Sequence, residues 1–372
     1  MRKLTKLLAG ATTMAAAVAM LAGTVTTASA APNDPPKGVV PKAYDIVGVG
    51  AQTDDALFDQ LSLDYNKTIP AKKHNSAHPW LYSFDATGSA SIRTKAGAKY
   101  IDRPNGSKAG ILALKANVKD GKSDFAIDFA RSSSGRSSYA AALGANGEAY
   151  VAFARDAITY ATRTAKSGGT DAPGNLTTKD LTEIYTCAAS ARNWKAFGGK
   201  NATIKPFLPQ SNSGTRSQFL KDINVTNPGS CVSDGTGATG SIEENEGTNK
   251  LLDSAAAIFP FSVGSYVQQA FHSSGKDKNK FGTDQIGVLG LDKVNGIAPL
   301  SGKVINHAIA VSPFGRTLYN VVRSISKTKI LPILVPIFGT KAQHGFLCSS
   351  KVAAADITDY GFLSWPTCGS IS

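Results

Sequence analysis

The chain has 372 residues, of which 42% are hydrophobic and 18% are charged, and its formal net charge at pH 7 is +13. This composition provides enough apolar side chains for a large buried core and excludes a globally disordered chain. A basic surface attracts anions in general. The positive residues are scattered, however, and no basic run is interleaved with aromatic residues, so nucleic acid is not an expected partner.

The first thirty residues have the pattern of a signal peptide. Arg2, Lys3 and Lys6 precede an apolar stretch, and Ala28-Ser29-Ala30 provides the small-x-small pattern that a signal peptidase cleaves. Removal of residues 1–30 near Ala30 lowers the net charge from +13 to +10. No cysteine lies near the cleavage point, so no lipid anchor is predicted. We expect the mature protein to be secreted or to lie outside the cell envelope.

The rest of the chain alternates strand and helix patterns. Residues 31–42 are rich in proline and predict a flexible N-terminus. Residues 44–50 form an apolar run broken by glycines, and a helical pattern follows it. Further strands are predicted at 125–130 and 149–154, and Thr177 has the position of a helix N-cap with Asp180 three residues later. This alternation predicts an α/β fold with a largely parallel sheet.

The four cysteines, Cys187, Cys231, Cys348 and Cys368, are an even number in a protein predicted to be exported. Two disulfides are therefore expected, and proximity in the sequence favours Cys187–Cys231 with Cys348–Cys368 among the three possible pairings. The five histidines form no cluster with cysteines or carboxylates at metal-ligand spacing, so no metal and no cofactor is predicted.

Four loops rich in glycine or serine stand directly before a predicted helix, at residues 48–53, 105–107, 131–135 and 211–216. The first turn of a helix carries unsatisfied N–H groups and a partial positive charge, so it favours an anion. One such loop is ordinary capping chemistry, but four together indicate an oxyanion site with many donors. The acidic stretch 243–247 is interpreted instead as a solvated loop, because adjacent acids point in different directions.

The sharpest of these loops, Ser213-Gly214-Thr215, resembles the anion-holding turn of the phosphate-binding proteins that serve bacterial phosphate ABC importers. Other segments are similar to motifs of that family in the same order along the chain: 47–53, 105–107, 128–133 and 258–266. The resemblance covers about residues 44 to 365.

The resemblance implies a two-lobe fold of the periplasmic-binding-protein type 2, with a mixed, mostly parallel sheet in each lobe and the ligand cleft between them. Lobe 1 is expected to comprise residues 43–155 and 318–372, and lobe 2 residues 156–317. Each lobe then holds two cysteines, so both disulfides stay within a lobe. We expect a monomer.

The resemblance also implies that the protein binds phosphate or a related oxyanion, without covalent chemistry, and that an ABC importer is a possible membrane partner. The implied ligand-binding residues are Gln52, Thr53, Ser107, Arg131, Ser132, Ser133, Ser213, Gly214, Thr215 and Arg216. Two positions depart from the family: Pro209 stands in place of its usual arginine, and Ser133 in place of its aspartate. The identity of the ligand and the selectivity for phosphate over sulfate therefore stay open, with Arg131 or Arg216 as the candidate positive charge.

Two other functions remain open. A secreted surface-interaction protein could keep this fold without a small ligand. A phosphate-ester hydrolase is disfavoured because Gly106-Ser107 lacks the second glycine of a nucleophile elbow, where Ala109 stands.

Overall fold

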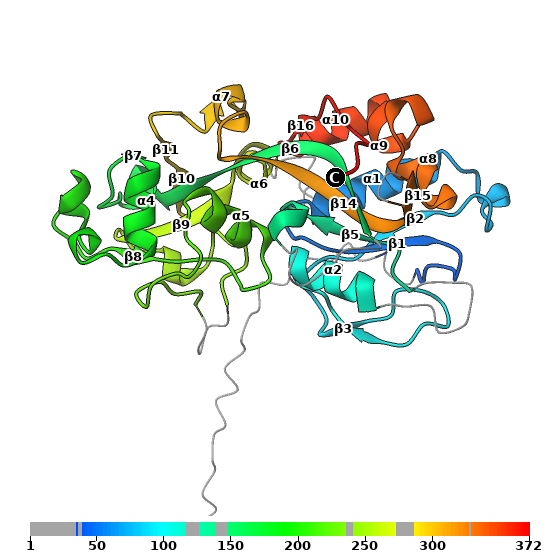
Figure 1. Cartoon of the computed structure of the whole chain (residues 1–372), viewed down its shortest axis with the longest axis horizontal. Coiled ribbons are helices and arrows are strands. Elements are labelled where there is room, and N and C mark those ends of the chain that lie inside the picture. Colours follow the sequence, from blue (N-terminus) through cyan, green and yellow to red (C-terminus); the bar gives the residue numbers. More distant parts are fainter. Residues whose placement is uncertain are drawn as a thin grey trace, which may run out of the picture.

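The computed structural model describes residues 35, 39–116, 126–138, 148–235, 241–272, 286–326 and 329–372. The predicted signal peptide lies outside the described residues. Two lobes lie side by side, and two long strands, β6 and β14, run from one lobe into the other (Figure 1). The fold is thus the two-lobe α/β fold that the sequence predicted.

One sheet extends through both lobes, with the strand order β2-β1-β5-β14-β6-β9-β8. These strands are β1 (Ile46–Gly50), β2 (Leu81–Ser83), β5 (Phe129–Ser132), β6 (Glu148–Arg163), β8 (Lys205–Pro206), β9 (Ala257–Ser262) and β14 (Gly315–Ser326). Pairing is parallel between β1 and β2, β1 and β5, and β8 and β9. It is antiparallel wherever β6 or β14 takes part. The strand–helix repeats therefore produce the parallel pairs. The two long strands make the sheet mixed and continuous between the lobes, whereas a mostly parallel sheet in each lobe was expected.

Shorter strands complete the sheet system. Three of them extend the main sheet: β10 (Leu289–Leu291) and β16 (Leu363–Ser364) pair with β6, and β15 (Lys329–Ile330) pairs with β14. Three two-stranded sheets are formed by β3 (Ser91–Ile92) with β4 (Ile101–Asp102), β7 (Asn175–Leu176) with β11 (Lys293–Val294), and β12 (Leu300–Ser301) with β13 (Val304–Ile305).

Lobe 1 has helices on both faces of β1, β2 and β5 (Figure 1). One face is covered by α1 (Asp55–Lys67), α8 (Val335–Phe338), α9 (Phe346–Ser349) and α10 (Lys351–Asp359), and the other by α2 (Ser107–Ala116). On the first face the ring of Phe58 packs against Phe129 and Phe153, with centroids 5.5 and 5.4 Å apart. Ile111 and Leu114 of α2 are buried on the second face. Apolar residues on alternate sides of the strands thus anchor both helical layers.

Lobe 2 is built around β8, β9 and the far half of β6. Its helices are α4 (Thr178–Tyr185), α5 (Gly214–Asp222), α6 (Val263–Val267) and α7 (His307–Ala310). The helix predicted after Thr177 is confirmed with its capping box: the Thr177 hydroxyl accepts from the Asp180 N–H, and the Thr177 N–H donates to the Asp180 carboxylate. Tyr185 at the end of this helix is fully buried in the same hydrophobic cluster as Trp194 and Phe219.

Both predicted disulfides are present, Cys187–Cys231 in lobe 2 and Cys348–Cys368 in lobe 1. The hydrophobic clusters of the two lobes separate along the long strands, since Ala154 and Leu318 belong to one cluster and Ala157 and Phe314 to another. We keep the predicted lobe boundaries, 155/156 and 317/318, as a proposal that these clusters support.

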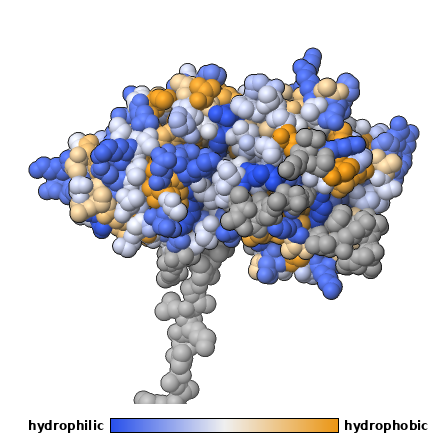
Figure 2. Space-filling view, viewed as in Figure 1, coloured by the Kyte–Doolittle hydropathy of each residue, from blue (hydrophilic) through white to orange (hydrophobic). Residues whose placement is uncertain are grey.

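The surface is mostly hydrophilic on the face seen in Figure 2, where hydrophobic residues form small separate groups. Within the described ranges, no helix is both long enough and apolar enough to cross a membrane.

Candidate functional site

The four predicted loops meet where the two lobes touch. Three of them belong to lobe 1, namely the loop after β1, the start of α2 and the end of β5, and the fourth is the start of α5 in lobe 2. Strands β1 and β5 are parallel neighbours, and Gly50 pairs with Arg131 and bridges to Asn105. Because parallel strands end at the same edge of a sheet, the loops that follow them are brought together.

A buried carboxylate lies at the centre of this junction. Glu244 is fully buried, and its Oε1 atom accepts hydrogen bonds from the N–H groups of Gln52 and Thr53 at 3.1 and 3.0 Å and from the Thr53 hydroxyl at 2.9 Å. Its Oε2 atom accepts from the Thr215 N–H at 3.2 Å and from the Ser213 hydroxyl. Five donors from both lobes therefore converge on one carboxylate.

The prediction of a solvated loop at 243–247 is wrong for Glu244. Adjacent acids do point in different directions, as the sequence suggested: Glu243 accepts from the Asn105 amide at 2.8 Å, and Glu246 accepts from the Asn249 amide at 3.2 Å. Ile242, just before them, is buried in the core of lobe 2 and fixes the loop against the lobe junction. Glu244 therefore points inward between its two neighbours.

Ser107 and Ser133 form a hydroxyl pair beside Gly214 at the start of α5. Their Oγ atoms are 3.3 Å apart, and the Ser107 hydroxyl also accepts from the Ser133 N–H at 3.1 Å. A Cβ atom at Gly214 would lie 2.3 Å from both hydroxyl oxygens, so only glycine fits at the first residue of α5. The start of α5 thus packs directly on lobe 1. Ser132, the next predicted residue, donates its hydroxyl to the Ser134 carbonyl and stabilises the turn.

The two arginines predicted to neutralise the ligand point elsewhere. Arg131 is fully buried, and it donates to the carbonyl oxygens of Ala51 and Phe84 at 3.0 and 2.9 Å. Arg216 donates to the Pro209 carbonyl at 2.8 Å and lies 3.3 Å from Asp234. Among the described contacts of Glu244, neither guanidinium appears. In this conformation both side chains stabilise the loops of the site through hydrogen bonds to backbone carbonyls.

Arg316, which the sequence analysis missed, supplies the positive charge at the junction. It is 3% exposed on β14, and its Nη1 atom donates to the Thr215 hydroxyl at 3.0 Å and to the Ser133 carbonyl at 3.2 Å. Its guanidinium also binds Asp156, its register partner on β6, at 2.8 and 2.9 Å. No glycine-rich loop precedes a helix here, so the loop pattern could not reveal Arg316. Strand β14 reads GRTLYNVVRSIS, which mixes polar and apolar residues and contains a second arginine, Arg323, so its sequence does not single out Arg316.

Asp54 adds a second buried carboxyl group next to the site. It is fully buried, neither oxygen accepts a hydrogen bond from another described residue, and the Arg131 Nε atom is 3.8 Å away. Burial raises the pKa of Asp54 to about 7; Arg131 and Arg316 lower it in part, and the Glu244 carboxylate raises it further. Asp54 therefore gains and loses a proton near neutral pH.

Several further hydrogen bonds cross the junction. The Asn245 amide donates to the Gln52 carbonyl at 2.7 Å, the Ser265 hydroxyl donates to the Thr53 carbonyl at 3.2 Å, and the Gln210 amide donates to Asn105 at 2.9 Å. The two lobes are therefore closed on one another around Glu244.

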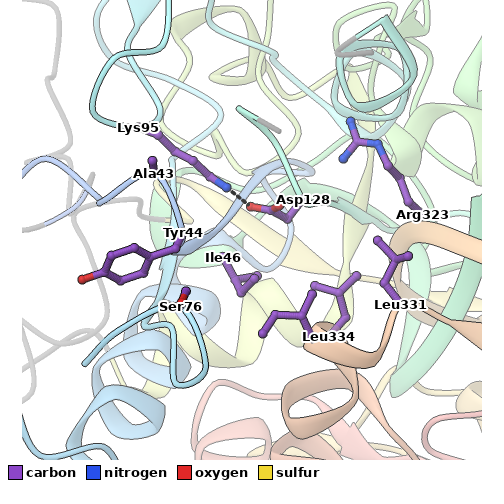
Figure 3. Close-up of a pocket in the computed structure, with 10 residues that line it drawn as sticks. Ala43, Tyr44, Ile46, Ser76, Lys95, Asp128, Arg323, Leu331 and Leu334 are labelled. Carbon is purple, nitrogen blue, oxygen red and sulfur yellow. Dashed lines mark ion pairs between the residues drawn. The ribbon is translucent and has the colours of Figure 1, made fainter. Parts of the chain in front are cut away.

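A separate cavity of about 220 Å³ lies in lobe 1 (Figure 3). The ion pair between Lys95 and Asp128, 2.7 Å long, lines one part of it, and Leu331 and Leu334 line another. Asp128 belongs to the segment that resembles a family motif, and here its carboxylate also accepts from the Val47 N–H at 2.8 Å. None of the predicted ligand-binding residues lines this cavity. In the described part of the chain, no group of three His, Cys, Asp or Glu residues could hold a metal ion.

Comparisons with known proteins agree with this architecture. Residues 44–325 match the family described as the PBP superfamily domain. The structure is similar to an ABC-type phosphate transport receptor from Vibrio cholerae, with a TM-score of 0.53 and 18% identity over 86% of this chain and 100% of that one. It is also similar to a putative phosphate ABC transporter substrate-binding protein from Clostridium perfringens, with a TM-score of 0.50 and 15% identity over 86% and 99% of the two chains.

At these identities the structural likeness shows a common fold. No curated protein matches the sequence. The family match covers most of the chain, including lobe 2, most of lobe 1 and the four loops at their junction. The chain therefore belongs to the PBP superfamily.

Proposed function

We propose that this protein is a secreted solute-binding protein that captures phosphate or a similar oxyanion between its lobes. The observation that carries the proposal is the convergence of five donors from both lobes on the buried oxygens of Glu244. Backbone N–H groups and hydroxyls can only stabilise this arrangement if an acceptor with several lone pairs lies at its centre. This convergence therefore supports a site for the oxygens of an anion.

The proposed ligand contacts are the predicted residues at the junction together with Arg316. They are Gln52, Thr53, Ser107, Ser133, Ser213, Gly214 and Thr215, with Arg131, Ser132 and Arg216 holding the loops in place. Arg316 would replace the family arginine whose position Pro209 occupies. An anion bound here would contact both lobes, so binding would favour the closed state.

Selectivity follows from the residue types. A carboxylate at the position of Ser133 would accept the proton of hydrogen phosphate and repel fully ionised sulfate. The Ser133 hydroxyl carries no charge, so we expect sulfate to compete with phosphate. Glu244 is the nearest carboxylate to these donors, and its contribution is considered below.

The proposal also covers the location of the protein, its membrane partner and its oligomeric state. Export would follow from the signal peptide at 1–30, and delivery of the captured anion to an ABC importer from the resemblance to transport receptors. We propose a monomer that binds without turnover.

Isothermal titration of the purified, phosphate-stripped protein tests the proposal. We expect saturable binding of phosphate that the double variant Ser213→Ala/Thr215→Ala abolishes. Ser217→Ala is the matched control, because it removes a hydroxyl of the same helix that donates to the Ser213 carbonyl. An absence of heat with phosphate and with sulfate, from folded protein, would contradict the proposal.

One observation favours a second function. Glu244 already fills the junction, as expected of a secreted surface-interaction protein that keeps the fold without a small ligand. That function predicts no binding of either anion by any variant.

A further inference from the structure

We infer that Glu244 is a built-in anion, which holds the two lobes together in the absence of ligand and which an external oxyanion has to displace. The displacement of Glu244 by an external oxyanion rests on the proposed function. The closing contact, by which Glu244 holds the two lobes together, can be tested without any ligand.

The carboxylate contacts both lobes at once. Its Oε1 atom is bonded to Gln52 and Thr53 of lobe 1, and its Oε2 atom to Ser213 and Thr215 of lobe 2. Hydrogen bonds to a charged acceptor are stronger than neutral ones, and a buried site removes the competition of water. Because Glu244 belongs to lobe 2, its bonds to lobe 1 exist only while the lobes are closed.

The same donors cannot serve two anions. A backbone N–H group or a hydroxyl has one hydrogen to donate, and the N–H groups of Thr53 and Thr215 and the hydroxyls of Thr53 and Ser213 already donate to Glu244. A second anion beside Glu244 would also add negative charge to a buried junction in which the charge of Arg316 is already balanced by Asp156. Occupation by Glu244 and by an external oxyanion are therefore mutually exclusive.

The neighbours of Glu244 couple its position to the lobe junction. Glu243 accepts from Asn105, and Asn245 donates to the Gln52 carbonyl, so three consecutive side chains of lobe 2 bind lobe 1. When the lobes separate, all three contacts break together. The donors on each side then become available, and an external anion can replace the carboxylate before the lobes close again.

This arrangement lowers the apparent affinity for the external ligand. The apparent dissociation constant equals the intrinsic one divided by the fraction of molecules in which Glu244 has left the junction. Glutamine at this position would turn one acceptor oxygen into an NH₂ donor that faces other donors. We therefore expect Glu244→Gln to bind phosphate at least about tenfold more tightly than the wild-type protein.

The experiment compares wild type, Glu244→Gln, Glu244→Ala and the control Glu246→Gln. The control removes the same charge from the same loop, where Glu246 bonds to the Glu243 N–H and to Asn249. Each protein is titrated with phosphate and with sulfate. Amide hydrogen exchange without ligand is then measured for peptides that contain residues 52–53 and 213–215. Circular dichroism confirms that each variant is folded.

Faster exchange on both sides of the junction and tighter phosphate binding, in both Glu244 variants but not in the control, would support the inference. Unchanged exchange would overturn it, whatever the titrations show. Equal or weaker binding by the Glu244 variants, with clear binding by wild type, would also overturn it while the proposed function stands; weaker binding would make Glu244 a direct contact of hydrogen phosphate. If no protein binds either anion, the proposed function fails, and the exchange result alone decides the closing contact.

Discussion

The Nη1 atom of Arg316 lies 3.0 Å from the Thr215 hydroxyl, and the same atom is 3.2 Å from the Ser133 carbonyl. A strand that runs through both lobes therefore contacts lobe 2 through Thr215 and lobe 1 through Ser133. Since Asp156 pairs with Arg316 on the adjacent strand, the guanidinium is held in one orientation. The positive charge of Arg316 at the junction thus comes from one of the two strands that connect the lobes.

Removal of the positive charge of Arg316 should weaken phosphate binding. We expect Arg316→Gln to lower the affinity for phosphate by about 100-fold, because a charge-assisted hydrogen bond in a buried site is worth on the order of 2–3 kcal/mol. Isothermal titration measures the loss. Arg155→Gln is the control, since Arg155 lies on β6 next to Asp156 and its Nε atom donates to the Ala310 carbonyl away from the site. Equal affinities of wild type and Arg316→Gln would show that Arg316 does not contact the ligand.

The contact at Gly214 should be equally sensitive. A methyl group there would lie 2.3 Å from the Ser107 and Ser133 hydroxyl oxygens, so Gly214→Ala should keep the lobes from closing. We expect a larger radius of gyration by small-angle X-ray scattering and weaker phosphate binding. Gly174→Ala is the control, because the nearest atom to its added Cβ is 3.9 Å away. A closed, fully active Gly214→Ala protein would contradict the tight packing of α5 on lobe 1.

The buried Asp54 predicts a pH dependence of stability. Its pKa is about 7 in the folded protein and 3.8 in the unfolded chain, so the folded state binds the extra proton between these values. Stability should therefore fall as pH rises through this window, by on the order of 2 kcal/mol between pH 5 and pH 7, and stay level above it as far as Asp54 is concerned.

Asp54→Asn tests this dependence. The amide does not ionise, and Arg131 keeps its bonds to the Ala51 and Phe84 carbonyls. We therefore expect the variant to be more stable relative to wild type at pH 8 than at pH 5. The free energy of unfolding of both proteins, measured by denaturant unfolding at each pH, gives this difference. The same difference at both pH values would mean that another group is responsible.

The two disulfides should contribute stability without affecting capture. They enclose separations of 20 and 44 residues, for which chain entropy predicts about 3 and about 4 kcal/mol. Each lies within one lobe, so Cys348→Ala/Cys368→Ala and Cys187→Ala/Cys231→Ala should lower the unfolding midpoint and leave phosphate affinity near that of wild type. A large change in affinity would indicate that a disulfide shapes the junction.

Sequence reasoning predicted the two-lobe fold and the loops that meet at the lobe junction. The strand–loop–helix patterns at 44–63 and around Thr177 were readable because hydrophobic periodicity and capping are local properties. The four loops were found for the same reason. Strand β6 was predicted only over 149–154 and β14 was not predicted at all, because a strand buried in a crossing between lobes has no local signal of its own.

The central residue was missed for a different reason. Glu244 stands in an acidic, polar stretch whose composition is that of a surface loop. Its burial depends on Ile242, which packs in lobe 2, and on donors of Thr53 that lie 191 residues away in the chain. A contact of that range between a carboxylate and two backbone turns cannot be seen in one sequence, and the same holds for Arg316 and Thr215.

The long strands have a consequence for how the molecule melts. Strands β6 and β14 pair along their length from Gly315 to Arg323, past a bulge between Leu318 and Tyr319 at the border of the lobes. Neither lobe can lose its part of these strands without exposing backbone hydrogen bonds of the other. Calorimetry should therefore record one cooperative unfolding transition for the whole molecule. Either lobe produced by itself would contain only part of β6 and β14, with backbone hydrogen-bonding groups that lack their partners.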